Sequence, residues 1–203
     1  DPRKGMKEIK HLQSKGINIS SEDFGISSNC HVTLAYHIDD DLGDRKKERH
    51  TSTGSGIRPT AVDKYGRVGV RFEEFLDRQT FIDILKDKRF PKTQQINGRT
   101  IEDFANSYAE EIEFLRQFSV LQTDILSNKD FKYGIGEGAQ GFKLDVDKGL
   151  YPGITSSNIF FISSLLRLLP FFPSLNFIPS QIDSCLLRGP IILAVMTSLV
   201  DSL

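Results

Sequence analysis

The chain has 203 residues, which is enough for one sizeable hydrophobic core with an appendage. Its 26 Lys and Arg residues balance 27 Asp and Glu residues, and the net charge of −1 argues against a protein that binds nucleic acid. The two cysteines, Cys30 and Cys185, stand alone, so the sequence predicts a reducing compartment rather than a disulfide-bonded secreted protein.

Apolar residues in the first half recur at helical spacing. A helix over residues 3–15 is predicted by three of them placed before Gly16: Met6, Ile9 and Leu12. Residues 30–38 instead alternate apolar and polar side chains, which predicts a strand at least at the start of the segment. Residues 40–56 are polar and contain glycines, so we expect a loop there.

Further along, helices are predicted over 72–76 and 80–88, the second with Phe81, Ile84 and Leu85 on one face. Thr100 is a favourable N-cap, with Asp103 three residues later. One long amphipathic helix from there to about Leu126 is predicted by apolar residues at three- and four-residue spacing: Ile101, Phe104, Tyr108, Ile112, Leu115 and Phe118. Residues 131–136 are expected to form a strand, so the predicted fold class is α/β with a partial sheet and surrounding helices.

Residues 136–158 read GEGAQGFKLDVDKGLYPGITSSN and contain the most informative pattern of the chain. Gly136, Gly138 and Gly141 fit the G-x-G-x-x-G pattern of dinucleotide-binding folds, which requires a helix that opens at the glycines. The following residues alternate and then reach Pro152-Gly153, which disfavours that helix and the dinucleotide interpretation.

The same segment resembles the signature of the adenylosuccinate synthetase family. The matching pieces occur in the family's order: Glu137-Gly138-Ala139-Gln140-Gly141, Leu144-Asp145-Val146-Asp147, Tyr151-Pro152 and Thr155-Ser156-Ser157-Asn158. A second block, residues 51–67, resembles the family loop T-T-G-x-G-I-G-P-x-x-x-D-K-x-x-R, with Ser55 as a small departure. The resemblance covers about residues 3–158 and favours a helix over residues 36–47, which the alternation over 30–38 leaves open.

The resemblance implies a GTP-dependent carbon–nitrogen ligase that joins IMP and L-aspartate to form adenylosuccinate in AMP biosynthesis. It implies a P-loop-like ligase fold, a homodimer in the cytoplasm, and GTP and Mg²⁺ as cofactors. The family's N-terminal G-D-E-G-K-G-K loop, its catalytic Asp and His, and its guanine-reading K-x-D do not occur in this sequence. We therefore expect an internal piece of such an enzyme, with no catalytic residue of its own and without the principal ligands of GTP and Mg²⁺.

Four residues match IMP-binding positions of the family. Thr53, in a glycine-containing loop that lets backbone N–H groups approach an anion, matches a contact to the IMP 5′-phosphate. Arg67 matches an arginine that reaches the phosphate bound by the neighbouring subunit. Gln140 matches the amide at the IMP base, and Thr155 matches a second hydroxyl donor to the phosphate.

The sequence predicts no metal site. Asp145 and Asp147 alternate along an edge, where aspartates are more often solvated or cap a turn, and the family's metal site lies elsewhere. The four histidines have no metal-ligand spacing. Leu144 matches an apolar position near the nucleotide, and its spacing alone predicts a core residue.

Composition changes abruptly after Asn158. Residues 159–203 contain few charges, namely Arg167, Asp183, Arg188 and Asp201, and three prolines interrupt their first half. This segment is predicted to be a separate apolar tail beside a synthetase-like part, 1–158. A membrane span needs ~20 uninterrupted apolar residues, so a membrane anchor is disfavoured. The sequence does not distinguish a divergent family segment that is buried in the core from a tail that is unrelated to the enzyme.

The sequence is also compatible with three functions other than that of the ligase. One is an IMP-binding protein that has lost phosphoryl transfer, and another is a related synthetase that uses guanine nucleotides. A third, of a different class, is a membrane-associated protein anchored by residues 159–203.

Overall fold

The computed structural model describes residues 1–46, 53–121 and 141–156. The chain divides into two compact units, Asp1–Leu121 and Gln122–Leu203. Within the described residues, the helices are α1 (Pro2–Ser14), α2 (Ala35–Lys46), α3 (Ile57–Gly66), α4 (Phe72–Leu76), α5 (Arg78–Ile84), the π-helix η1 (Leu85–Arg89), α6 (Ile101–Asn106), α7 (Ala109–Leu115) and the 3-10 helices η2 (Arg116–Phe118) and η3 (Phe142–Leu144).

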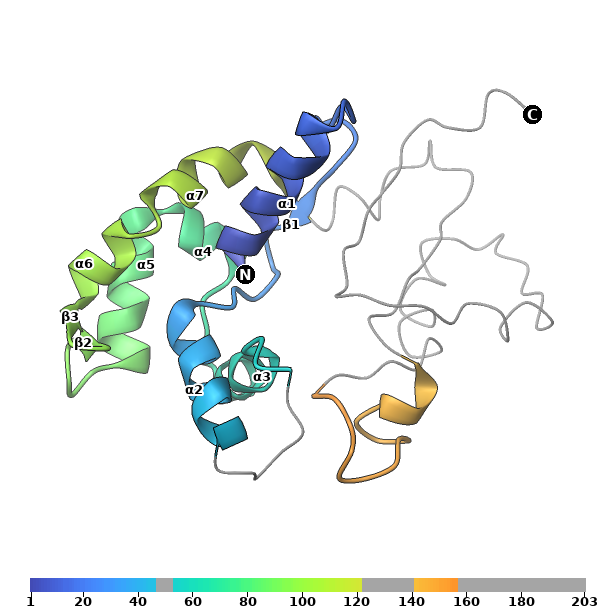
Figure 1. Ribbon diagram of the computed structural model, residues 1–203. Helices are drawn as coiled ribbons and strands as arrows, with labels where there is room; N and C mark the ends of the chain where they lie inside the picture. The colour runs from blue at the N-terminus through green and yellow to red at the C-terminus, as the bar shows by residue number, and fades with distance from the viewer. Residues whose placement is uncertain (47–52, 122–140, 157–203) are drawn as a thin grey trace. The chain divides into compact units, whose positions relative to one another are not determined.

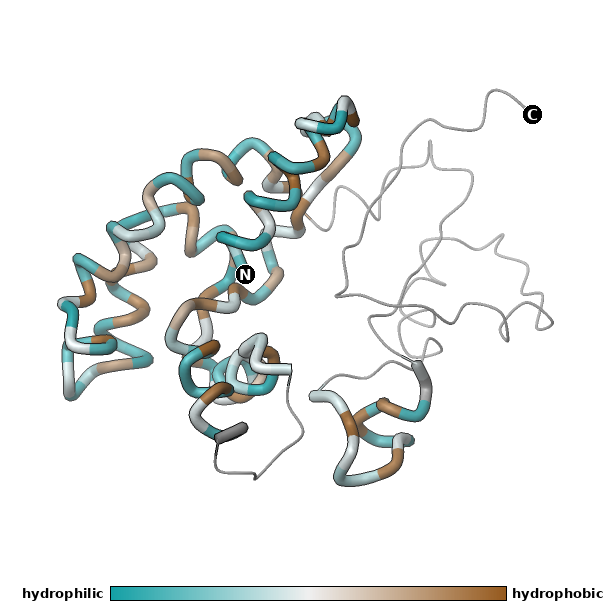
Figure 2. The backbone as a smooth tube through the Cα atoms, in the orientation of Figure 1, coloured by the Kyte–Doolittle hydropathy of each residue, from teal (hydrophilic) through white to brown (hydrophobic). Residues whose placement is uncertain are grey.

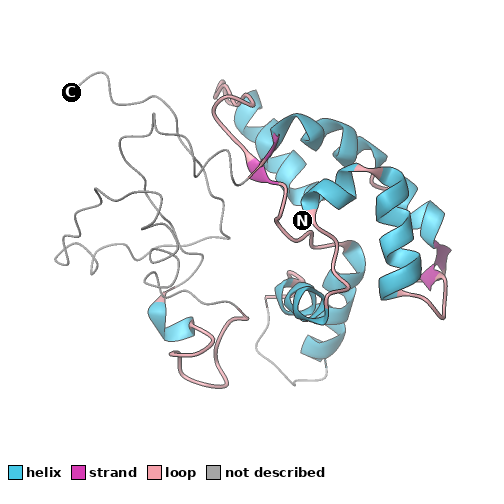
Figure 3. Cartoon of the chain, turned by 180° about the vertical axis from the view of Figure 1, so that it is seen from behind, coloured by secondary structure: helices cyan, strands magenta, loops and turns pink. Residues whose placement is uncertain are grey.

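Two small sheets accompany these helices in the first unit (Figure 3). Strand β1 (Ile26–Ser27) pairs in parallel with β4 (Ser119–Val120), so that Ile26 lies opposite Ser119. Strands β2 (Gln95–Ile96) and β3 (Arg99–Thr100) form an antiparallel hairpin. The mixture of helices with a short parallel pair agrees with the predicted α/β class.

Helix α1 confirms the prediction for residues 3–15. It begins after Asp1, whose carboxylate accepts hydrogen bonds from the backbone N–H groups of Arg3 and Lys4 at 3.0 and 3.4 Å. It ends before Gly16, whose φ of 82° suits a glycine that terminates a helix. Ile9 is buried, and α1 packs against α7.

The core of the first unit is rich in aromatic side chains. Phe75, Phe81 and Tyr108 are fully buried, and Phe75 meets the other two rings edge to face at centroid distances of 5.2 and 5.7 Å. Apolar and hydrophilic residues alternate along the helices (Figure 2), and helices α1, α2, α4, α5, α6 and α7 each contribute apolar side chains to this core. The predicted helices over 72–76 and 80–88 are confirmed, although η1 ends the second in a π-helical turn.

The long helix predicted from Thr100 to Leu126 is wrong in its continuity. Thr100 is the N-cap, as predicted, and its hydroxyl oxygen accepts a hydrogen bond from the Asp103 N–H at 3.1 Å. The helix then breaks at Ser107 and Tyr108 into α6 and α7, and the chain becomes extended in β4. Residues beyond 121, including the end of this helix at Leu126 and the predicted strand over 131–136, lie outside the described residues.

The strand predicted over residues 30–38 is also wrong, apart from one isolated bridge between His31 and Arg71. Helix α2 begins at Ala35 and continues to Lys46, so the helix that the family resemblance favours is present. For the same reason, the loop predicted over 40–56 is wrong for residues 40–46. Residues 53–56 are loop, as predicted.

The described part of the second unit, residues 141–156, is a turn-rich segment with one short 3-10 helix, η3. Because no α-helix opens at Gly141, this segment disagrees with the dinucleotide-binding interpretation. The tail, 159–203, lies outside the described residues. Among the helices of the described ranges, none is both long enough and apolar enough to cross a membrane.

Candidate functional site

The loop that carries Thr53 leads into helix α3 through two glycines. Gly54 and Gly56 have φ angles of 70° and 77°, in the left-handed region that glycine adopts without strain. A Cβ atom on Gly56 would lie 2.9 Å from Thr33 Cγ2 and 3.0 Å from the backbone nitrogen of Ile38. The turn therefore requires glycine at position 56 on both conformational and steric grounds, while the Thr53 side chain is exposed.

Helix α2 holds this turn in place. The Gly56 N–H donates a hydrogen bond to Oδ2 of Asp41, a fully buried residue of α2, at 2.9 Å. The Thr60 hydroxyl donates to the Gly56 carbonyl oxygen at 2.7 Å and lies 3.0 Å from the Thr33 hydroxyl. The loop is thus fixed to α2 on one side and to the first turn of α3 on the other.

A buried carboxylate, Asp63, joins α3 to two other elements. Its Oδ2 accepts hydrogen bonds from the Tyr36 hydroxyl at 3.1 Å and from Arg89 Nε at 2.7 Å. His37 Nε2 lies 3.0 Å from the same oxygen. Because His37 Nδ1 accepts the backbone N–H of Leu34 at 2.9 Å, the ring proton lies on Nε2 and is donated to Asp63.

Burial and neighbouring groups shift the pKa values of Asp63 and Tyr36 in opposite directions. Burial alone would raise the pKa of Asp63, but hydrogen bonds from His37 and Arg89 outweigh burial, and the pKa lies below its ordinary value. Burial, followed by the negative charge of Asp63, raises the pKa of Tyr36 far above its ordinary value, so Tyr36 stays a donor. The Arg89 guanidinium carbon lies 5.3 Å from the centroid of the Tyr36 ring.

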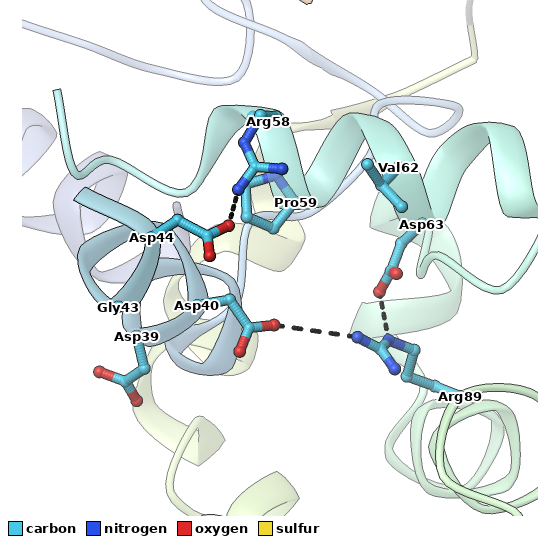
Figure 4. A pocket seen from close by; sticks show the side chains of 9 residues that line it. All are labelled: Asp39, Asp40, Gly43, Asp44, Arg58, Pro59, Val62, Asp63 and Arg89. Atoms are coloured by element: carbon cyan, nitrogen blue, oxygen red, sulfur yellow. Dashed lines mark hydrogen bonds and ion pairs between the residues drawn. The ribbon is translucent and has the colours of Figure 1, made fainter. Parts of the chain in front are cut away.

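A cavity of about 320 Å³ opens beside this network, between α2, α3 and η1 (Figure 4). Its charged lining consists of Asp39, Asp40, Asp44, Asp63, Arg58 and Arg89. Both arginines face carboxylates: Arg58 contacts Asp44, and Arg89 bonds to Asp63 and lies 3.9 Å from Asp40. Since carboxylates outnumber guanidinium groups and both guanidinium groups are paired, the cavity is unsuited to a phosphate anion.

Arg67 lies at the opposite end of α3 from the Thr53 loop. It is the C-cap residue, with φ 61° and ψ 29°, a left-handed conformation that is uncommon for a residue with a side chain. The Asp63 carbonyl oxygen accepts the N–H groups of Val68 at 3.0 Å and Gly69 at 3.1 Å, which closes the turn around Arg67. The Arg67 side chain is exposed.

In the second unit, Thr155 is half-buried, and its backbone N–H donates to the Leu144 carbonyl oxygen at 2.8 Å. Asp145 is fully buried, and its Oδ1 accepts the N–H groups of Asp147 and Lys148 at 2.9 and 3.0 Å. Asp145 therefore caps a turn, which is one of the two roles that the sequence indicates, and it is not solvated. The Leu144 side chain is 42% exposed, so the core position indicated by its spacing is wrong.

Comparison with known proteins identifies the family. The family model described as adenylosuccinate synthetase matches residues 1–168. This chain belongs to the adenylosuccinate synthetase family. Over 170 residues it is 34% identical to the adenylosuccinate synthetase of Listeria monocytogenes serovar 1/2a and 35% identical to that of Geobacillus sp. (strain WCH70). Each alignment covers 78% of this chain and 39% of the relative, so the chain spans about two fifths of the length of these synthetases.

The fold agrees with that membership. The structure of a fully ligated adenylosuccinate synthetase from Plasmodium falciparum matches with a TM-score of 0.60 and 21% identity, covering 86% of this chain and 42% of the other. The predicted α/β class, as part of a synthetase fold, is thereby confirmed.

Of the four residues that the family resemblance indicates for IMP, two lie in the described part of the first unit. Thr53 and Arg67 occupy opposite ends of α3, whose 10 residues span roughly 15 Å. Thr155 belongs to the second unit, and Gln140 lies outside the described residues. The network of Tyr36, His37, Asp63 and Arg89 was not predicted, because its members come from three elements and no short motif links them.

Proposed function

We propose that this chain carries the IMP-binding part of an adenylosuccinate synthetase, the ligase that uses GTP to join IMP and L-aspartate. Support comes from family membership over residues 1–168 together with residues of the IMP-binding types at four matching positions. The observation that carries the proposal is the Thr53–Gly56 turn, which Asp41 fixes before the N-terminus of α3.

This turn has the chemistry of a phosphate-binding loop. The first turn of a helix has N–H groups that no carbonyl of the helix accepts, and its dipole favours an anion. Gly56 packs against α2, while glycine at position 54 lets an oxyanion approach the backbone closely, and the exposed Thr53 hydroxyl supplies a further donor. We assign the 5′-phosphate of IMP to this turn.

Arg67 is proposed to act on the IMP of a second subunit. The Thr53 turn and Arg67 are separated by the length of α3, roughly 15 Å, which is too far for both to contact one phosphate within one chain. A guanidinium fork on an exposed, left-handed turn suits a phosphate presented by a partner molecule. The proposed functional unit is therefore a homodimer, and we place it in the cytoplasm.

In the proposed reaction, the γ-phosphoryl group of GTP is transferred to O6 of IMP, and the aspartate amine then displaces phosphate. The family implies Mg²⁺ for this step, but no cluster of three or more His, Cys, Asp or Glu side chains in residues 1–46, 53–121 and 141–156 is placed to hold a metal ion. The described residues thus do not fit a metal site, and their proposed roles are to bind and orient IMP.

Calorimetric titration of the full chain with IMP tests this assignment. Arg67→Leu should weaken binding by roughly tenfold to a hundredfold, because a charge-assisted contact contributes ~1.5–3 kcal/mol. Arg99→Leu, which changes an exposed arginine of the β2–β3 hairpin, is the matched control and should bind as the parent chain does. Absence of IMP binding at millimolar concentration would refute the proposal.

Two further measurements separate the remaining roles. Mixing the Arg67→Leu and Gln140→Ala chains should recover part of the binding, because a hybrid dimer contains one intact composite site. No recovery despite demonstrated subunit exchange would place Arg67 in its own subunit's site or in none. Formation of adenylosuccinate from GTP, IMP and aspartate by the purified chain would establish the ligase, whereas IMP binding without turnover would indicate a binding protein.

A further inference from the structure

Asp63 lies in the second half of α3, and its side chain is 6% exposed. The family resemblance includes this residue in a motif but gives it no role. Its Oδ2 atom receives hydrogen bonds from three side chains: Tyr36 and His37 of α2 and Arg89 of η1. A rotation or translation of α3 against α2 would break several hydrogen bonds to one charged acceptor, which is costly in a buried position.

The backbone carbonyl group of Asp63 closes the turn at the end of α3. Its carbonyl oxygen accepts the N–H groups of Val68 and Gly69, the two residues that follow Arg67. The turn is also closely packed, because a Cβ atom on Gly69 would lie 3.1 Å from His31 Cδ2 and 3.2 Å from the Asp63 carbonyl carbon. The side chain of Asp63 is thus anchored to two neighbouring elements while its carbonyl group closes the turn that presents Arg67.

Arg67 has a left-handed backbone conformation that the surrounding turn must enforce. A residue with a side chain is strained at φ 61°, and surrounding structure must enforce such a conformation. The left-handed C-cap directs the Arg67 side chain away from the path that a continuing helix would give it. Asp63 connects this strained turn to the buried part of the first unit through side-chain hydrogen bonds.

We infer that Asp63 is a positioning residue: its hydrogen bonds to Tyr36, His37 and Arg89 set the orientation of the Arg67 turn and hence the direction of the Arg67 guanidinium. This inference rests on the proposed function for its consequence, the contact of Arg67 with a nucleotide phosphate. Its structural part, that Asp63 fixes the orientation of the Arg67 turn, does not depend on any ligand. The same α2 helix fixes the Thr53 turn through Asp41, so the two ends of α3 share one support.

Hydrogen exchange of the full chain tests the first half of the inference without a ligand. Asp63→Asn should accelerate exchange of the Val68 and Gly69 amides on the order of tenfold, with the Ile9 amide of α1 unchanged. Tyr36→Phe removes a single hydroxyl donor and should give a smaller acceleration at the same two amides. It replaces Asp63→Asn as the test variant if Asp63→Asn proves to be poorly folded. Asp83→Asn, on the exposed face of α5, is the control and should leave both amides unchanged. Unaltered exchange at Val68 and Gly69 in both test variants would overturn the inference.

A double-mutant cycle on IMP affinity tests the second half. If Asp63 acts through Arg67, Asp63→Asn should weaken IMP binding in the parent chain by roughly tenfold and produce no further loss in the Arg67→Leu background. An equal loss in both backgrounds would show that Asp63 supports the fold in general and would overturn the positioning role. If the parent chain does not bind IMP, the proposed function fails, and the exchange measurement still decides whether Asp63 holds the turn.

Discussion

Replacing Gly56 with alanine should be far more damaging than its size suggests. The added methyl group would lie 2.9 Å from Thr33 Cγ2, 3.0 Å from the Ile38 nitrogen and 3.1 Å from the His37 carbonyl carbon. Two of these atoms are backbone atoms of α2 and cannot rotate away. Overpacking costs ~1–3 kcal/mol, and a left-handed conformation costs alanine about 1–2 kcal/mol, so we expect a loss of roughly 2–5 kcal/mol.

Urea denaturation of the full chain, followed by circular dichroism, measures this loss. Gly5→Ala is the matched control, because no atom lies within 4 Å of its added methyl group and Gly5 is inside α1. Alanine is the better helix former there, so the control should be stabilised by about 0.5–1 kcal/mol. Gly56→Ala should also weaken IMP binding, since relief of the clash displaces the Thr53 turn. Equal unfolding free energies for the two variants would refute the assigned geometry of the turn.

Three further predictions follow from the first unit. Phe75→Ala removes a fully buried ring between Phe81 and Tyr108, and should lower the free energy of unfolding by ~3–5 kcal/mol in the same denaturation assay. Thr100→Ala removes the N-cap of α6 and should cost about 1 kcal/mol, whereas a loss below the error of the assay would contradict the capping role. The lowered pKa of Asp63 stabilises the fold above the unfolded value of 3.8, and this contribution is lost as the pH falls through the folded pKa. The difference in melting temperature between the parent chain and Asp63→Asn should therefore shrink from pH 7 to pH 3, and a constant difference would contradict it.

Helices whose ends are marked by local residues could be predicted from the sequence. Gly16 ends α1 and Thr100 begins α6, and both act through bonds to residues only a few positions away. The break between α6 and α7 has no comparable mark, because the apolar spacing continues through it. At the break, the Tyr108 hydroxyl accepts the Ala35 N–H at 2.8 Å, a contact across 73 positions that local pattern cannot indicate.

The same contact explains the wrong strand prediction for residues 30–38. Val32, Leu34 and Tyr36 are all buried, so the alternation correctly indicates burial but not backbone conformation. The Ala35 N–H is satisfied by Tyr108, and the Leu34 N–H is satisfied by His37 Nδ1. Helix α2 therefore begins without a standard capping residue, which is the signal that sequence reasoning uses.

Helix α3 shows most clearly why the arrangement of the candidate site could not be predicted from the sequence. It buries Pro59 and Asp63 but exposes Ile57, Val62 and Tyr65 by 46%, 58% and 68%, the reverse of an amphipathic pattern. Hydrophobic periodicity cannot orient such a helix. Its orientation instead comes from directional hydrogen bonds, through Asp41 at the first turn and Asp63 near the last. Buried polar bonds fix register more strictly than apolar contact does, because a small rotation that keeps apolar contact breaks them. Under the proposed function, α3 holds a phosphate-binding turn at one end and Arg67 at the other, and hydrogen bonds that fix its register would keep both in place even though they bury the charge of Asp63.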